Sequence, residues 1–201
     1  METMNMKAKK SAFGTREITK MALLAALLCV SAYITIPLGF TPASLTLQTM
    51  IVNLIAILLT PMESFITLLV YILIGAVGVP IFSGGQGGLG KLFGPTGGYI
   101  FAFLAAAPAM SFTKKYFIAA AEKVVKNTSV ARIAACTVNA ILVGMVIVYL
   151  IGTVYMKFTL NRGWMDVLLM AVIPFIPLDI AKCILASVIG VPLKKALDKL
   201  N

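Results

Sequence analysis

Asp179 and Lys182 are the residues of this sequence whose types and spacing most directly suggest chemistry. They lie within residues 163–193, a stretch whose only other charge is Asp166 near its start. Residues three apart share one face of a helix, so the two side chains can form a pair or together hold a polar ligand. A charge at bilayer depth costs roughly 2.5 to 3.5 kcal/mol and usually faces a cavity or a partner. The pair therefore marks a candidate binding site, and an ion pair that only fixes helix packing is the alternative.

The composition predicts that this pair belongs to a membrane protein. The chain has 201 residues, of which 60% are hydrophobic and 12% are charged, and its mean hydropathy is +1.00. An ordinary soluble domain has roughly 25% charged residues. At about 20 residues per span, the length fits one all-α transmembrane domain, residues 1–201, with six helices. The expected spans are 17–36, 45–59, 64–79, 99–112, 131–156 and 167–193.

Two prolines leave the last span open to two interpretations. It is either one long helix or a helix broken at Pro174 and Pro177. A break would place Asp179 in the first turn of a helix that begins at Pro177. The positive end of the helix dipole would then favour its carboxylate.

The net charge of +10 is distributed unevenly along the chain. Three loops expected on one side of the membrane hold only Lys91, Lys157 and Arg162, which is the positive-inside asymmetry of a protein with both termini in the cytoplasm. Nucleic-acid binding is disfavoured because no aromatic residues are interleaved with the basic ones on a soluble surface. The basic groups expected in the cytoplasm are Lys7, Lys9, Lys10, Arg16, Lys20, Lys114, Lys115, Lys123, Lys126, Arg132, Lys194, Lys195 and Lys199.

The sequence lacks the residues that most enzymes and metal sites use. Histidine is absent, which removes the commonest general base and the commonest transition-metal ligand. The three cysteines lie far apart in apolar segments, so neither a disulfide framework nor a metal site is expected. We therefore expect no metal, no cofactor and no enzymatic activity. A membrane-embedded enzyme, such as a protease or lipid transferase, is kept as the alternative from a different class.

Ala22 and Ala26 form a small-xxx-small pair in the first span. Small residues at this spacing let another helix approach closely, so the pair is a candidate docking face for a partner protein. The alternative is that these are ordinary alanines of a membrane helix.

Four segments resemble a known family. They are TLQ at 46–48, GVPIF followed by GGQGG at 78–88, GPTGGY at 94–99 and IPLDIAK at 176–182. Together they resemble the BioY family, the biotin-specific substrate-binding (S) components of energy-coupling factor (ECF) transporters, over essentially the whole chain. The resemblance implies an S-component fold in a prokaryotic cell membrane. It also implies high-affinity capture and uptake of biotin with a transmembrane coupling (T) protein and two ATPases.

The resemblance further implies a set of substrate-binding residues. Asp179 and Lys182 match the last-helix pair of the family, which is expected to hold the ureido ring, and Gln86 stands where the family often presents an amide. Some members carry an arginine after the GGY segment, where this chain has Ile100, so Lys91 or backbone N–H groups are expected to meet the carboxylate. An S component for another vitamin is the alternative. The expected set is Asp179, Lys182, Gln86, Gly85, Gly87, Tyr99, Gln48, Phe82 and Lys91.

Overall fold

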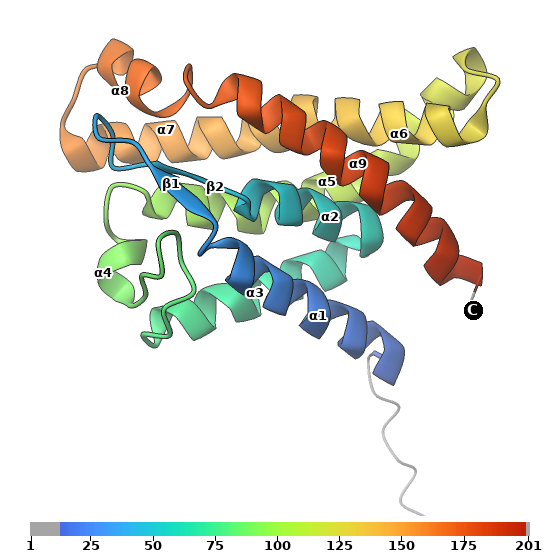
Figure 1. The fold of residues 1–201 in the computed structure, drawn as a ribbon, viewed down its shortest axis with the longest axis horizontal. Helices are drawn as coiled ribbons and strands as arrows, with labels where there is room; N and C mark the ends of the chain where they lie inside the picture. The colour runs from blue at the N-terminus through green and yellow to red at the C-terminus, as the bar shows by residue number, and fades with distance from the viewer. Residues whose placement is uncertain (1–12, 200–201) are drawn as a thin grey trace, which may run out of the picture.

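The computed structural model describes residues 13–199, and most of them are helical (Figure 1). The predicted cytoplasmic residues Lys7, Lys9 and Lys10 lie outside this range. A π-helix, Ala140–Met145, joins α6 to α7 without a break. The other elements are α1 (Thr15–Ser31), β1 (Thr35–Pro37), β2 (Ser44–Thr46), α2 (Gln48–Leu58), α3 (Pro61–Ala76), α4 (Leu89–Leu92), α5 (Gly97–Val124), α6 (Thr128–Asn139), α7 (Val146–Leu160), α8 (Trp164–Ala171) and α9 (Ile176–Lys199).

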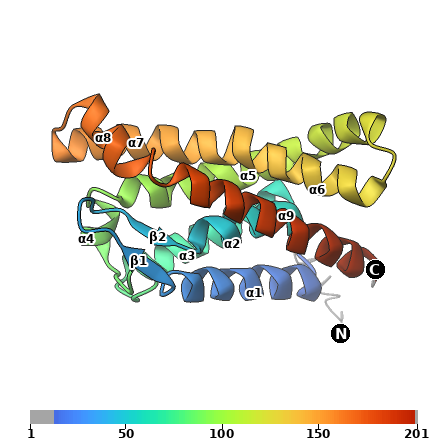
Figure 2. The same ribbon diagram turned by 45° about the horizontal axis from the view of Figure 1, so that its top comes forward.

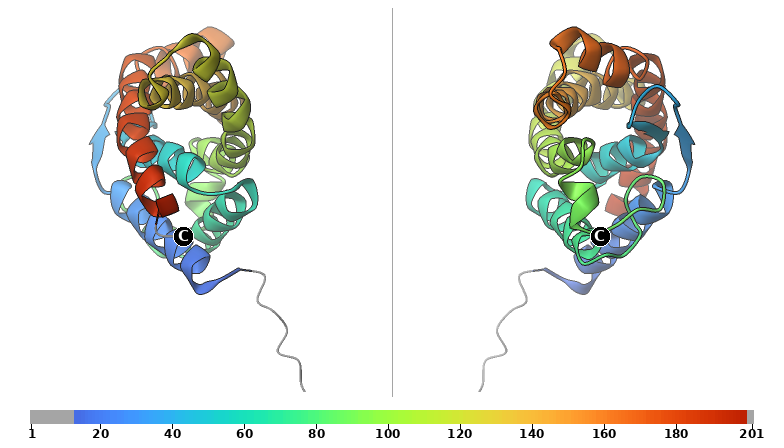
Figure 3. Two further views of the ribbon diagram at one scale, coloured as in Figure 1. Left: turned by 90° about the vertical axis from the view of Figure 1, so that its right-hand side faces the viewer. Right: turned by 90° about the vertical axis from the view of Figure 1, so that its left-hand side faces the viewer.

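The long helices run side by side and give the molecule two different ends (Figures 1 and 2). One end carries the β1–β2 hairpin, α4 and α8, and we call it the loop end. The other carries the start of α1, the α5–α6 connection and the last residues of α9, and we call it the terminal end. In the end-on views, α1 and α3 lie at one side of the bundle and α6, α7 and α8 at the opposite side (Figure 3).

Helix α2 is the most enclosed element. Every residue from Ile51 to Leu58 is buried, and the helix packs against α1, α3, α5 and α9. The chain then turns into α3 through a capping box, in which Thr60 and Glu63 satisfy each other's backbone N–H groups and Pro61 occupies the first turn. These local signals fix the tight turn that lets α2 and α3 follow each other directly.

The first span differs from its predicted bounds of 17–36. Helix α1 ends at Ser31, and Thr35–Pro37 instead form the strand that pairs antiparallel with Ser44–Thr46. β-Branched Thr35 and Ile36 favour extended backbone, and Pro37 cannot donate to a helix. The expected outer loop at 37–44 is therefore a β-hairpin at the loop end.

The fourth span, predicted at 99–112, is part of a longer helix. Helix α5 runs without interruption from Gly97 to Val124. Thr113 lies within this helix, and its hydroxyl donates to the carbonyl of Ala109 at 2.8 Å. The following segment is rich in Ala, Lys and Glu, which are strong helix formers.

The last predicted span, 167–193, is broken. Helix α8 ends at Ala171, a turn occupies residues 172–175, and α9 begins at Ile176. Pro174 lies in that turn, and Pro177 lies in the first turn of α9, where its missing N–H costs nothing. The break places Asp179 in the first turn of α9, beside the positive end of the helix dipole.

The outer surface of the bundle is strongly apolar. Many large hydrophobic side chains are exposed on α1, α3, α7 and α9, among them Leu23, Leu73, Leu150 and Leu185. By length and hydropathy, two helical segments of residues 13–199 could cross a membrane, 128–160 and 176–199. The shorter α2 and α3 are also apolar. This surface is the kind that a lipid environment would cover.

Candidate functional site

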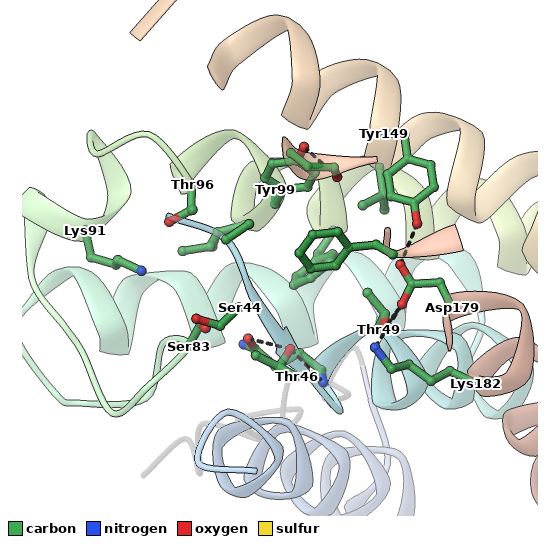
Figure 4. Close-up of a pocket in the computed structure, with 17 residues that line it drawn as sticks. Ser44, Thr46, Thr49, Ser83, Lys91, Thr96, Tyr99, Tyr149, Asp179 and Lys182 are labelled. Carbon is green, nitrogen blue, oxygen red and sulfur yellow. Dashed lines mark hydrogen bonds and ion pairs between the residues drawn. The ribbon is translucent and has the colours of Figure 1, made fainter. Parts of the chain in front are cut away.

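A small cavity lies at the loop end, among the hairpin, α2, α5, α7 and α9 (Figure 4). Its volume is about 80 Å³, below the roughly 300–1,000 Å³ of most ligand pockets. Segments from all along the chain meet there, so no short stretch of sequence defines it. The lining residues are Ala43, Ser44, Thr46, Gln48, Thr49, Ser83, Lys91, Thr96, Tyr99, Ile100, Phe103, Val148, Tyr149, Ala171, Phe175, Asp179 and Lys182.

Asp179 and Lys182 form a buried ion pair at the wall of this cavity. The Lys182 Nζ donates to Asp179 Oδ1 at 2.9 Å, and the two side chains are only 5% and 9% exposed. The helical spacing predicted from the sequence is thus realised within one turn of α9. Because both charges are shielded from water, each depends on the other and on neighbouring polar groups.

Two hydroxyl groups from other helices complete the surroundings of Asp179. Tyr149 on α7 donates to Oδ2 at 2.7 Å, and Thr49 on α2 donates to Oδ1 at 3.2 Å. Figure 4 shows the three donors converging on the carboxylate from three helices. Hydrogen bonds to an ionised group are stronger than those between neutral groups, so these three donors hold the Asp179 carboxylate firmly in position.

Lys182 retains hydrogen-bonding capacity. An ammonium group has three N–H donors, and Asp179 is the acceptor that residues 13–199 provide for it. A carboxylate can likewise accept about four hydrogen bonds, of which Asp179 receives three. The pair can therefore still donate to one group and accept from another, which suits a ligand that carries both an acceptor and a donor.

Gln48 and Tyr99 also line the cavity, as expected. The buried Gln48 side chain donates from Nε2 to the Tyr71 hydroxyl at 2.6 Å, and Tyr71 in turn donates to the Ile81 carbonyl at 3.0 Å. The Tyr99 hydroxyl donates to the Ala171 carbonyl at 3.4 Å. Both side chains are therefore oriented by neighbouring groups and present defined surfaces to the cavity.

Lys91 enters the cavity from the loop end, opposite Asp179 and Lys182 (Figure 4). Its side chain is half-buried, and no carboxylate within residues 13–199 pairs with it. Burial lowers the pKa of the Lys91 ammonium below its ordinary value. The cavity thus has a paired charge at one side and an unpaired cation at the other.

The other expected binding residues do not line the cavity. Gln86 is exposed, and together with Gly87 it lines a shallow surface depression that shares Lys91 and Thr96 with the cavity. Phe82 is fully buried, with its ring packed edge-on against Tyr71 at a centroid distance of 5.5 Å.

The two expected glycines have a structural reason to be glycine. Gly85 has a φ of +69°, a conformation that residues with a Cβ rarely adopt. At Gly87, a Cβ would lie 2.4 Å from the Val79 carbonyl oxygen. The glycine-rich segment 82–96 therefore folds tightly on itself, and the residues it contributes to the cavity are Ser83, Lys91 and Thr96.

Sequence reasoning missed Tyr149 and Thr49. A tyrosine within an apolar span is weak as a signal, because tyrosine also occurs at membrane interfaces. The direction of the Tyr149 side chain depends on the π-helix that precedes α7, because this π-helix changes which residues of α7 face the cavity relative to those of α6. Thr49 follows Gln48 directly, so a closer look at the start of α2 could have included it.

The remaining expectations concern metals and the docking face. Within residues 13–199, no group of three or more Cys, Asp or Glu side chains is arranged to hold a metal ion. Ala22 and Ala26 are both exposed on α1, next to the exposed side chains of Leu23 and Leu27. Their neighbourhood is apolar and accessible along one side of the helix.

Comparisons with known proteins agree with the resemblance. A "Biotin transporter BioY2" of Lactococcus lactis subsp. cremoris is 35% identical and covers 92% of this chain and 93% of its own. A "Biotin transporter BioY" of Thermotoga maritima is 32% identical over 90% of this chain and 96% of its own. A crystal structure of the "S-component for biotin from an ECF-type ABC transporter" matches with a TM-score of 0.80 and 27% identity.

That structure covers 94% of this chain and 95% of its own, so the similarity extends over the whole fold. A second structure, the "S component of a bacterial ECF transporter", matches at 18% identity with a TM-score of 0.54 and supports the fold alone. The model of the BioY family matches residues 4–199. The chain therefore belongs to the BioY family.

Proposed function

We propose that this chain is the substrate-binding component of an ECF-type transporter and that it captures biotin with high affinity. The observation that carries the proposal is the buried pair of Asp179 and Lys182 at a cavity wall. Biotin offers a ureido ring with N–H donors and a carbonyl acceptor, which matches the remaining capacity of this pair. In this proposal Asp179 accepts from a ureido N–H and Lys182 donates to the ureido carbonyl.

The rest of the cavity is assigned by its chemistry. Tyr149 and Thr49 hold the Asp179 carboxylate in position through their hydroxyl groups. Apolar side chains such as Phe103 and Phe175 face the ring system and the aliphatic chain of the ligand. Lys91, on the opposite side of the cavity, meets the ligand carboxylate, and the ligand thus lies between the Asp179–Lys182 ion pair and the Lys91 cation.

Entry of biotin requires the loop end to open. The cavity of about 80 Å³ is too small to enclose the whole vitamin without rearrangement. The segments above it are the hairpin with Ser44 and Thr46, the loop at Ser83 and the short helix that carries Lys91. We propose that these segments move apart to admit the ligand, and that Gln86 and Gly87 lie along the entry route.

We further propose a six-span topology with the terminal end in the cytoplasm. Most basic residues of the described chain gather at that end, whereas the elements of the loop end carry Lys91, Lys157 and Arg162. The positive-inside rule then orients the cavity toward the outside of the cell. The exposed apolar surface of the helices supports the same placement in the cell membrane.

Transport would require partners that supply energy. We propose that a transmembrane coupling protein with two ATPases docks on α1, where Ala22 and Ala26 are exposed and allow close helix approach. Copurification after mild solubilisation tests this assignment. The enzyme alternative receives no support from the relatives, which carry transporter names.

The test of the ligand is a binding assay on the purified chain with a panel of vitamins. Asp179→Asn is expected to weaken biotin binding by roughly 2 kcal/mol or more, about 30-fold, because one side of a buried charge-assisted contact is lost. Asp166→Asn is the matched control, since Asp166 lies exposed in the first turn of α8. Tight binding of riboflavin or thiamine without biotin binding would replace biotin by another vitamin.

A further inference from the structure

A second concave region lies at the terminal end, between α5, α6 and α9, and we call it the basic groove. Its volume is about 590 Å³. Both α5 and α9 pack against α6. The residues that line it are Ile57, Lys114, Lys115, Ile118, Ala119, Glu122, Thr128, Ser129, Arg132, Cys136, Val191, Pro192, Lys194, Lys195 and Asp198.

The basic groove carries an excess of positive charge. Five of its lining residues are lysine or arginine and two are acidic. The acidic side chains form ion pairs with Arg132 and Lys194, at 2.8 Å and 3.0 Å, and all four partners are more than a third exposed. Water screens such exposed pairs and makes them weak, so an anion can compete for the two cations.

Lys114 has a separate, structural task. Its Nζ donates to the carbonyl groups of Ala56, Ile57 and Leu59 at 2.8, 3.0 and 2.7 Å, at the end of α2. Of the other cations that line the groove, Lys115 and Lys195 have no carboxylate partner among residues 13–199. Lys115 lies over the rings of Phe112 and Tyr116, which keeps its ammonium near the surface of α5.

The basic groove also has apolar lining residues. They include Ile118 and Ala119 from α5 and Val191 and Pro192 from α9. Toward the middle of the bundle, α9 continues with exposed hydrophobic side chains such as Ile189. A groove lined by both cationic and apolar side chains suits a molecule that has an anionic head and hydrocarbon chains.

We propose that the basic groove binds the phosphate head group of an anionic phospholipid from the cytoplasmic leaflet, with Lys115, Arg132 and Lys195 around the phosphate. Basic pockets between transmembrane helices on the cytoplasmic side are suited to such head groups. The hydroxyl groups of Thr128 and Ser129, at the start of α6, are further donors in the lining. The inference rests on the membrane topology proposed above, but not on biotin as the ligand.

Native mass spectrometry of the full-length protein in detergent tests this site. The protein is titrated with phosphatidylglycerol, with phosphatidylcholine and with inorganic phosphate. The test variant is Arg132→Gln with Lys195→Gln, and the matched control is Lys123→Gln with Lys126→Gln, because these two lysines are exposed on the same end but outside the groove. Each removed charge is expected to weaken phosphatidylglycerol binding on the order of fivefold, whereas the control keeps it.

Four results would overturn the proposal. The test and control variants could bind phosphatidylglycerol equally well, or the unchanged protein could bind phosphatidylcholine as tightly as phosphatidylglycerol. The unchanged protein could also bind inorganic phosphate as tightly as the lipid. Finally, the test variant could lose copurified ATPases while its lipid binding stays intact, which would assign the groove to a protein partner. Biotin binding is measured on the same samples. Loss of lipid binding with normal biotin binding in the test variant supports the groove, and absence of biotin binding in every sample contradicts only the proposed ligand.

Discussion

The cavity at the loop end and the basic groove at the terminal end both contain lysine–aspartate pairs, but in opposite environments. In the cavity, Lys182 and Asp179 are 5% and 9% exposed, whereas in the groove Lys194 and Asp198 are 39% and 53% exposed. A buried charge is strongly destabilising without its partner, while an exposed one is solvated in any case. In the two proposals above, the first site therefore selects its ligand by geometry and the second attracts its ligand by charge.

The largest expected effect is a difference in stability between variants of the buried Lys182–Asp179 pair and variants of the exposed Lys194–Asp198 pair. Lys182→Met leaves the Asp179 carboxylate buried without its cation, which should destabilise the protein by roughly 3 kcal/mol. Lys194→Met removes the same side chain from an exposed pair of the same helix and should cost less than about 1 kcal/mol. Thermal unfolding of both variants in the same detergent checks the difference. Equal losses would contradict the difference in burial on which the comparison is based.

A smaller effect is expected at the hydroxyl group that holds Asp179. Tyr149→Phe removes the 2.7 Å hydrogen bond to Oδ2 and should weaken biotin binding by roughly 1.5 kcal/mol, because the bond has a charged acceptor. Tyr155→Phe, on the same helix, removes only a 3.3 Å bond to the Leu92 carbonyl and serves as the control. Isothermal titration calorimetry with both variants measures the effect. An unchanged affinity in Tyr149→Phe would show that this hydroxyl does not position the carboxylate for the ligand.

Salt should affect ligand binding differently in the cavity and in the basic groove. Raising the salt concentration from about 0.1 M to about 1 M shortens the Debye length from roughly 10 Å to roughly 3 Å. Phosphatidylglycerol binding at the exposed groove should therefore weaken several-fold, whereas biotin binding in the enclosed cavity should change by less than about twofold. Both can be followed in one titration series. A parallel loss of both ligands would mean that the cavity is open to screening ions.

The smallest effect concerns the unpaired cation of the cavity. Burial lowers the pKa of Lys91 below the ordinary lysine value of 10.5, so this side chain loses its charge at a lower pH than a solvated lysine does. If the charged form binds the ligand carboxylate, biotin affinity falls as pH rises through that lowered pKa. Affinities measured between about pH 7 and about pH 10 test this. Lys91→Arg should remove the dependence, because arginine stays charged throughout, and a persistent pH dependence would point to another group.

The parts of the site that could be read from the sequence are those with a strong local signal. Asp179 and Lys182 stand out because charge is rare in an apolar helix. Pro174 and Pro177 indicated a broken last span as one of two possibilities, and the structure has this break. Tyr149 could not be found in this way, since its orientation depends on the π-helix and on the packing of α7 against α5. Phe82 packs in the core and does not line the cavity, and the sequence could not show this because an aromatic residue beside a glycine-rich segment can point either way.

Helix α2 connects the cavity mechanically with residues nearer the terminal end. It has eleven residues and is therefore about 16 Å long, and it is held at both tips by other helices. Gln48 and Thr49 are bound to Tyr71 and Asp179 at one tip, and Lys114 and Ser111 grip carbonyl groups just beyond the other. A helix resists compression along its axis, so a displacement of Gln48 or Thr49 at the cavity should be passed along α2 to the groups that Lys114 and Ser111 hold.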